Sequence, residues 1–416
     1  MVNFLKNFKH SKYVFLIGII DKITFFLFFL TIARLNTEAD YGKFIIITVF
    51  FNIISPIFDL GFKYFLQREA ASNNEVFSYY VNIIFSLKVL FFIIYLFLGV
   101  FYLFILLKLQ LLVIVIFGSL LFILNFIQLF NQIYYGLNEY YYPFKIHFFI
   151  RFLIIVFCFI NLFFIKYADI QFLISIFLFL SLLHILIITN NLKKFNIQIS
   201  FKIFSFNEYF KIVQSSYLLG ISLIFVLIYD KIDVQILYYF IDIKIIAFYS
   251  IAYSFYKFPQ IFSNSILVPA YSNFCQDFSK KHFDWHKIKT TFFILIGLAS
   301  FVLLFYQLTA YYIIKYIYGD KYLLSSIYLK ILSIGIFFYF ANNFTGVFLN
   351  SLRMEKITAK STLYATILNI LANLLLLFIF RSIYSAIISS IITELFIFVY
   401  QLFYIQKNRN VFNEKF

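Results

Sequence analysis

Long apolar runs separated by short polar breaks make up most of this chain. A membrane-spanning helix needs about 20 mainly apolar residues, because each residue rises about 1.5 Å through about 30 Å of hydrocarbon. The pattern predicts about twelve such helices, since runs such as 25–30 do not alternate as barrel strands would. The predicted spans are 13–34, 42–63, 78–104, 110–135, 142–165, 170–190, 212–239, 246–273, 290–314, 324–349, 360–380 and 383–405.

The polar breaks divide these spans into two halves. The longest break, 191–211, lies at the midpoint and carries four lysines. We therefore predict a six-helix N-terminal lobe at 1–190, a linker at 191–211 and a six-helix C-terminal lobe at 212–416. The string Asp21-Lys22-Ile23 recurs as Asp230-Lys231-Ile232, 209 residues later in a chain of 416. This spacing indicates a faint duplication whose halves each place charge at membrane depth.

Composition and charge support a membrane protein and set its orientation. Apolar residues make up 63% of the chain and charged residues 12%, whereas soluble domains have roughly 45–50% and about 25%. With the N-terminus in the cytoplasm, 19 of the 34 Lys and Arg residues lie in cytoplasmic segments and 8 on the other side, so both termini are predicted to be cytoplasmic. The net charge of +16 is thus explained by topology and does not indicate nucleic-acid binding. The first apolar run has no cleavage site and is predicted to be a retained span.

Four aspartates fall inside predicted spans, where an ionised side chain is costly and usually faces a bundle interior or a watery cavity. They are Asp21, Asp59, Asp230 and Asp233. Asp230 and Asp233, three residues apart, share a helix face and repel unless a cation or proton lies between them. One interpretation is therefore a site for a coupling ion or proton. The other is that these carboxylates pair with Lys or Arg on neighbouring helices to fix packing.

Three basic residues inside apolar runs are the candidates for contact with an anionic substrate: Lys22, Arg151 and Lys257. The alternative is an internal salt bridge with one of the four aspartates. Lys88 and Lys330 are expected to snorkel from span ends or faces, and Glu394 is expected to be structural. Further polar residues within the spans are His147 and His184, which are titratable, and Asn342, Asn343, Asn369 and Asn373, which are expected to form interhelical hydrogen bonds.

Catalytic and metal-binding patterns are missing from the sequence. It has no Gly-rich phosphate loop, no clustered His ligands and no nucleophile beside a base. Its two cysteines, Cys158 and Cys275, lack metal or redox spacing and predict no disulfide. We therefore predict neither an enzyme nor a bound metal or cofactor.

Several loose motifs, taken in order, carry a family resemblance over nearly the whole chain. They are Tyr41-Gly42, Ser55-Pro56 with Asp59-Leu60-Gly61, Arg68-Glu69-Ala70, Asp233 to Leu237, Ala247 to Ala252, Pro269, Tyr318-Gly319, Asn369-Ile370, and Ser385-Ala386 with Thr393-Glu394. In this order and spacing the chain resembles the Wzx-type O-antigen flippases. These form the polysaccharide-transport branch of the multidrug/oligosaccharidyl-lipid/polysaccharide (MOP) exporter superfamily.

The resemblance implies a MATE-like fold, with two six-helix lobes around a central cavity. It implies a multi-pass protein of the bacterial cytoplasmic (inner) membrane. It also implies an undecaprenyl-diphosphate-linked oligosaccharide, such as an O-antigen unit of lipopolysaccharide, as the cargo, flipped to the periplasmic leaflet by alternating access. Lys22, Arg151 and Lys257 would then meet the diphosphate, with Na⁺ or H⁺ as a coupling ion and a polysaccharide polymerase or assembly protein as a partner.

The chain departs from the family pattern at two places. Ser254 stands where relatives often have a basic residue, with Lys257 one turn later, and Tyr384-Ser385 replaces a usual glycine. Two alternatives to a flippase follow from the sequence. A drug/cation antiporter of the same superfamily needs a net acidic cavity, whereas basic residues here are at least as numerous as acidic ones. A membrane O-antigen polymerase usually has a long external loop, and the external segments here are short.

Overall fold

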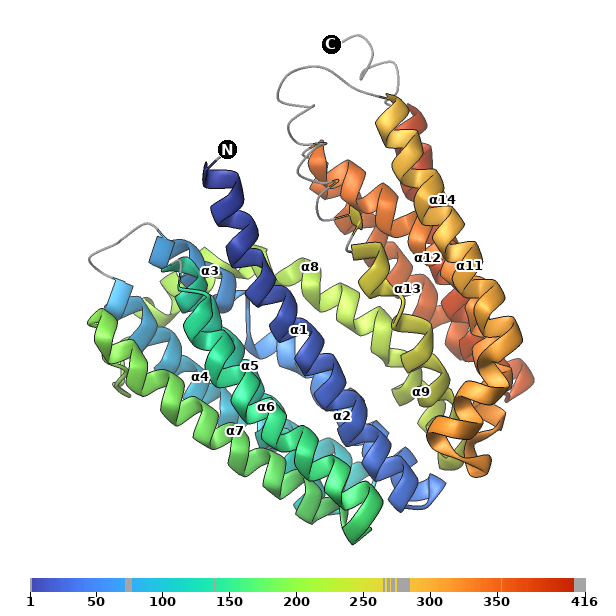
Figure 1. Cartoon of the computed structure of the whole chain (residues 1–416), viewed down its shortest axis with the longest axis horizontal. Helices are drawn as coiled ribbons and strands as arrows, with labels where there is room; N and C mark the ends of the chain where they lie inside the picture. Colours follow the sequence, from blue (N-terminus) through green and yellow to red (C-terminus); the bar gives the residue numbers. More distant parts are fainter. Residues whose placement is uncertain are drawn as a thin grey trace. The chain divides into compact units, whose positions relative to one another are not determined.

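The computed structural model describes residues 2–71, 77–137, 139–264, 266–267, 270, 274, 285–352 and 354–407, and these are almost entirely helical. The chain divides into two compact units, Met1–Leu227 and Ile228–Phe416. This boundary lies inside the helix that follows the predicted linker. Each unit is a bundle of long helices joined by short turns (Figure 1).

The first unit is built on hairpins of antiparallel helices. Helix α1 packs against α6, and α5 lies between α3 and α7. Two helices continue into a turn of π-helix, Val100–Leu106 after α4 and Asn161–Ile165 after α6. The helices are α1 (Val2–Leu35), α2 (Glu38–Ile54), α3 (Phe62–Ala71), α4 (Phe77–Gly99), α5 (Leu111–Gly136), α6 (Tyr141–Ile160) and α7 (Ile170–Leu192).

Helix α8 (Phe206–Tyr238) belongs to both units, and the rest of the second unit packs around α12. Helices α9, α11 and α14 each contact α12, and α13 packs against α14. The other bounds are α9 (Ile243–Lys257), α11 (Trp285–Tyr318), α12 (Leu324–Ser351), α13 (Glu355–Phe380) and α14 (Tyr384–Lys407).

Ten stretches within the described residues are long and apolar enough to cross a membrane. They correspond to ten of the predicted spans. The seventh, 212–239, lies on helix α8, part of whose side chains are outside the described residues, and the eighth, 246–273, is described only in part. Large apolar side chains are exposed along the bundles, among them Phe97, Phe164, Leu308 and Phe378. Exposed apolar surface on this scale is what a lipid-facing protein requires.

The second predicted span, 42–63, ends earlier than expected. Helix α2 passes into a 3₁₀ turn, Ser55–Phe58, in which Pro56 occupies an early position. Leu60 and Gly61 then adopt positive φ angles of 46° and 77°, and α3 begins at Phe62. Proline removes a backbone donor and glycine tolerates positive φ, so this sequence breaks the helix. The break places Asp59 at a bend instead of along a regular helix.

Two glycines make room for one aromatic ring in the core of the first unit. Phe51 of α2 is fully buried. A Cβ atom at Gly99 or at Gly118 would lie 2.5 Å from Cζ of Phe51. The ring therefore occupies space that only glycine leaves free on both α4 and α5.

The segment before α8 is held on the first unit by side chains of α4. The Ser200 N–H donates to Asn82 Oδ1 at 2.8 Å, and the Lys202 N–H donates to Ser86 Oγ at 3.1 Å. Helix α8 then begins with a capping box, in which the Ser205 N–H donates to Glu208 Oε2 at 2.8 Å and Ser205 Oγ accepts from the Glu208 N–H at 3.4 Å. The hydrogen bonds from Ser205 hold the pKa of Glu208 below its ordinary value.

Candidate functional site

Among the described residues, the acidic side chains inside the predicted spans lie in four clusters, two in each unit. In the first unit, the Asp21 cluster comprises Asp21 of α1, His147 and Arg151 of α6, and His184 of α7. Arg151 Nε donates to Asp21 Oδ1 at 2.8 Å, and His147 Nε2 lies 3.0 Å from the same oxygen. His184 packs against His147 with ring centroids 5.3 Å apart. Helices α1 and α6 therefore meet at one carboxylate, and α7 packs against His147 beside it.

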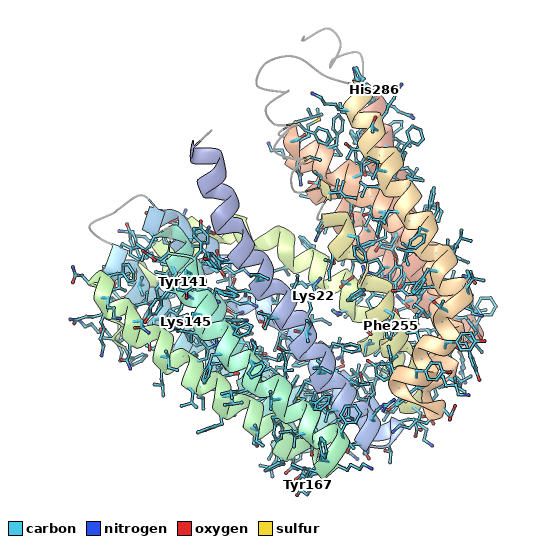
Figure 2. All side chains as sticks on the ribbon, viewed as in Figure 1. Lys22, Tyr141, Lys145, Tyr167, Phe255 and His286 are labelled. Atoms are coloured by element: carbon cyan, nitrogen blue, oxygen red, sulfur yellow. The ribbon has the colours of Figure 1, made fainter. Side chains whose placement is uncertain are left out.

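Burial within the Asp21 cluster is uneven. The Arg151 side chain is 3% exposed, whereas that of Asp21 is 28% exposed. The guanidinium also lies against two aromatic rings, with Cζ 5.6 Å from the Phe25 centroid and 5.3 Å from that of Phe177. Adjacent helical residues point about 100° apart, and Lys22 is accordingly exposed, with no ion pair to any described residue. Figure 2 shows Lys22 about halfway along α1.

The Asp59 cluster lies at the break after α2 and comprises Ser55, Asp59, Lys63, Lys88 and Asn125. Lys88 Nζ lies 2.9 Å from Asp59 Oδ1, and its side chain is 0% exposed. Lys88 also donates to Asn125 Oδ1, and Asn125 Nδ2 donates to Ser55 Oγ at 3.1 Å. Lys63 Nζ is 3.9 Å from the second carboxylate oxygen of Asp59. The expectation that Lys88 snorkels was wrong, because α4 passes directly beside the carboxylate at the break.

In the second unit, the Asp230 cluster surrounds Lys257 at the end of α9. Lys257 Nζ lies 2.7 Å from Asp230 Oδ1 and 3.3 Å from Glu394 Oε1. Glu394 also accepts from Asn342 Nδ2, and Lys231 Nζ is 4.0 Å from Asp230 Oδ2. Three tyrosine rings surround the ammonium group, at 5.5 Å, 5.4 Å and 4.3 Å for Tyr253, Tyr256 and Tyr339.

The Asp233 cluster is built from neutral donors. Asp233 accepts hydrogen bonds from Asn373 Nδ2 at 2.7 Å, Ser390 Oγ at 2.9 Å and the Tyr249 hydroxyl at 3.0 Å. Asn369, one turn before Asn373, donates to Thr393 Oγ1 at 3.2 Å. No cation of a described residue pairs with this buried carboxylate. Helices α8, α9, α13 and α14 are therefore joined by one anion.

These clusters show internal partners for several of the candidate residues. Asp230 and Asp233 both face α9, since Tyr253 donates to Asp230 at 2.8 Å and Tyr249 donates to Asp233. They do not share one partner, because Asp230 pairs with Lys257. Arg151 and Asp59 are likewise in internal ion pairs. Among the candidate cations, Lys22 and Arg151 lie in the first unit and Lys257 in the second.

Other predicted residues lie as follows. Asn342, Asn369 and Asn373 form interhelical hydrogen bonds, as expected. Lys330 is half-buried on α12, and Cys158 is buried on α6, whereas Cys275 and Pro269 lie outside the described residues. The sequence did not predict that Glu394 pairs with Lys257. The one sequence signal for a buried partner is the position of Glu394 within an apolar run, one residue after Thr393. Among the described residues, no His, Cys, Asp and Glu side chains are grouped as a metal site would require.

A separate pocket of about 220 Å³ lies in the first unit between the starts of α2, α5 and α7. Its charged lining residues are Asp40, Lys43 and Asp169. Asp169 also caps α7, accepting from the Gln171 N–H at 2.9 Å. None of the residues predicted from the sequence to bind substrate or a coupling ion lines this pocket.

Two bundles of long apolar helices with buried, paired charges define a multi-pass membrane protein with a MATE-like fold. The chain is similar to an inward-facing MATE family transporter of the MOP superfamily, with a TM-score of 0.72 and 13% identity, covering 93% of this chain and 95% of that one. It is also similar to the lipid II flippase MurJ in an inward closed conformation, with a TM-score of 0.68, 17% identity and coverage of 93% and 87%. A third similar structure is the eukaryotic MATE transporter AtDTX14, with a TM-score of 0.65 and 13% identity, covering 99% of this chain and 99% of that one.

The sequence places the chain more narrowly within this class. The family model described as Polysaccharide biosynthesis protein matches residues 8–274, more than half of the chain, and the chain belongs to this family. The resemblance to the polysaccharide-transport branch of the MOP superfamily is thereby confirmed. A comparison with curated protein sequences gives no match.

Proposed function

We propose that this protein is a lipid-linked oligosaccharide flippase without enzymatic activity. Its cargo would be an undecaprenyl-diphosphate-linked repeat unit of O-antigen or another polysaccharide, moved from the cytoplasmic to the periplasmic leaflet. The observation that carries the proposal is the position of Arg151. This guanidinium is buried at membrane depth in a member of a polysaccharide biosynthesis family, and it is held by a carboxylate at a single nitrogen.

The chemistry of a diphosphate suits this arrangement. Guanidinium groups bind phosphate oxygens through two parallel hydrogen bonds, which gives both affinity and orientation. Nη1 of Arg151 is buried and has no hydrogen-bond partner among the described residues. Lys22, exposed on the next residue after Asp21, adds a second cation on α1. In this proposal the cargo crosses by alternating access, and Lys257 is the candidate cation of the C-terminal lobe.

The test of this function must separate cargo binding from folding. Arg151→Ala alone leaves a half-buried carboxylate without its ion-pair partner. Arg151→Gln combined with Asp21→Asn is therefore the better variant, because it removes both charges and keeps two polar side chains. We expect the double variant to reach the membrane at the wild-type level and to lose export of surface polysaccharide at least tenfold. Lys43→Gln, which alters an exposed ion pair, is the control. Normal export by the double variant would contradict a role for Arg151 in cargo binding.

Coupling is proposed at the Asp233 cluster. Hydroxyl and amide oxygens around a carboxylate are hard ligands of the kind that small cations such as Na⁺ prefer, and a proton would also neutralise the site. Asp233→Asn keeps the size of the side chain and removes its charge. We expect transport by this variant to lose its response to an imposed Na⁺ or pH gradient. A gradient response equal to that of the wild type would leave Asp233 with a structural role only.

A drug/cation antiporter is the second candidate, and the second unit favours it. Its two clusters hold three carboxylates, Asp230, Asp233 and Glu394, against the two cations Lys231 and Lys257. This acidic excess and the tyrosine rings around Lys257 would suit a cationic substrate. Expression of the protein in a strain that lacks its gene separates the two functions. Restored export of polysaccharide without added drug resistance would favour the flippase. Added drug resistance without restored export would favour the antiporter.

Placement in the membrane completes the proposal. We propose the cytoplasmic (inner) membrane of a bacterium, both termini in the cytoplasm and lobes at 1–190 and 212–416 joined by the linker 191–211. A polysaccharide polymerase or assembly protein is the proposed downstream partner. Single cysteines introduced into 197–204 should react with a reagent only after it enters the cytoplasm, and labelling from outside would overturn the topology.

A further inference from the structure

Two histidines of the Asp21 cluster are buried without the partners that imidazoles require. His147 is 2% exposed and His184 is 0% exposed. Both ring nitrogens of His147 and both of His184 have no hydrogen-bond partner among the described residues, although His147 Nε2 lies 3.0 Å from Asp21 Oδ1. A buried polar group left unpaired is destabilising. The cluster is thus incompletely satisfied in this form of the protein.

The His147 ring has two neighbours that could accept from a protonated imidazole. A neutral imidazole has one N–H donor, whereas an imidazolium has two, one on each side of the ring. His147 stands between an acceptor on α1, Asp21 Oδ1 at 3.0 Å from Nε2, and an unpaired imidazole on α7. A neutral His147 can donate to one of these neighbours only. A protonated His147 can donate to both.

Arg151 competes with His147 for the same carboxylate oxygen. Arg151 Nε lies 2.8 Å from Asp21 Oδ1, and this one contact makes the pair of Asp21 and Arg151 electrically neutral. A proton on His147 would give the buried cluster two positive charges for one carboxylate. Such an excess is costly in a low-dielectric interior unless an anion neutralises it. The other charged or titratable groups nearby are Lys22, exposed on α1, and the buried phenol of Tyr135 on α5.

We propose that His147 and His184 form a proton-binding site, in which a protonated His147 takes over Asp21 and frees the Arg151 guanidinium to bind an anionic ligand. By linkage, anion binding and proton binding then strengthen each other by the same factor. The ligand class is an oxyanion such as a phosphate or diphosphate group. The inference rests on the proposed function in one respect, namely that Arg151 is the anion contact.

The experiment measures sulfate binding to the full-length protein in detergent or nanodiscs between about pH 5 and pH 8, the range in which histidine titrates. Sulfate is the probe because its own charge is constant in this range. If binding takes up one proton, we expect affinity for sulfate to rise up to tenfold per unit fall in pH. His147→Gln keeps an amide donor for Asp21 and cannot be protonated, so its affinity should stay at the high-pH value throughout. His286→Gln, in α11 of the second unit, is the control and should keep the wild-type pH slope.

A second readout does not require a measurement of affinity. The chain has five histidines, so ¹⁵N spectra of its imidazoles can be assigned by single substitutions. Sulfate should shift the titration of the His147 signal to higher pH, and Arg151→Gln should abolish that shift.

Each possible result decides the inference. A pH slope that persists in His147→Gln, or a wild-type affinity independent of pH, would overturn it while leaving the flippase proposal intact. Sulfate binding that survives in Arg151→Gln, or no binding at any pH, would also overturn it. The export assay with the Arg151→Gln and Asp21→Asn double variant tests the flippase function separately, because it contains no pH comparison.

Discussion

The ion pair between Lys88 and Asp59 gives the most direct test of how buried charges stabilise the first unit. We consider Lys88→Met, which keeps the length of the side chain and removes its charge. At 2.9 Å and an effective dielectric constant of about 20, the attraction between the two charges amounts to about 6 kcal/mol. Much of this is offset by the cost of taking both groups out of water, but removing one partner leaves that cost unbalanced. Such losses typically reach about 3–5 kcal/mol.

The surroundings of Asp59 place the expected loss at the lower end of this range. Lys63 Nζ, 3.9 Å from Asp59 Oδ2, retains part of the compensation. The methionine can pack on the rings of Phe122 and Phe126, which lie 5.9 Å and 5.6 Å from the Lys88 ammonium group. We therefore expect a loss of about 3 kcal/mol. For a domain of 150–250 residues this lowers the melting temperature by roughly 6–12 °C.

The assay is thermal unfolding of the purified protein, at one heating rate for all variants. Lys43→Met is the matched control, because the ion pair of Lys43 with Asp40 has side chains 45% and 44% exposed and should contribute less than about 1 kcal/mol. The double variant Lys88→Met, Asp59→Asn removes both charges and should recover at least half of the loss. Equal effects of Lys88→Met and Lys43→Met, or no recovery in the double variant, would refute the reasoning.

Two further predictions concern the backbone. Gly136→Ala should lower the melting temperature, because the new Cβ would lie 2.4 Å from the Gln67 carbonyl oxygen, and overpacking of this kind costs about 1–3 kcal/mol. Its control, Gly297→Ala, has open space around the new Cβ and should raise the melting temperature. Equal shifts in the two variants would contradict the close approach of α3 and α5. Lys108→Gly should stabilise the protein by about 1 kcal/mol, since Lys108 has φ of 53° and a left-handed conformation is strained for residues other than glycine. Lys145→Gly, inside α6, is its control and should destabilise the protein, whereas a loss of stability in both variants would argue against strain at Lys108.

The helices could be predicted because lipid imposes a simple rule on sequence. A run of apolar residues of the right length must form a helix, so the predicted span 324–349 and α12, Leu324–Ser351, almost coincide. The break after α2 was missed even though Pro56 and Gly61 are present. Ile57, Phe58, Leu60 and Phe62 continue the apolar run through the break, and its length favoured a continuous span.

The partners of the buried charges could be predicted only as a choice between interpretations. Asp21 and Arg151 are 130 residues apart, and no local pattern connects them. Lys88 resembles a snorkelling lysine in sequence because its neighbours are uniformly apolar. Its burial depends on the bend that carries Asp59, which is a feature of the fold. Spacing predicted the shared face of Asn369 and Asn373, since the two amides lie one turn apart.

The ring of Phe51 also limits how the sequence can drift among relatives of this protein. A methyl group at position 99 or 118 has no space while position 51 is aromatic. A smaller residue at 51 would open a cavity unless one of the glycines gained a side chain at the same time. Substitutions at these three positions should therefore occur together in an alignment of the family. A relative with alanine or a larger residue at 99 or 118 should have a residue smaller than phenylalanine at 51.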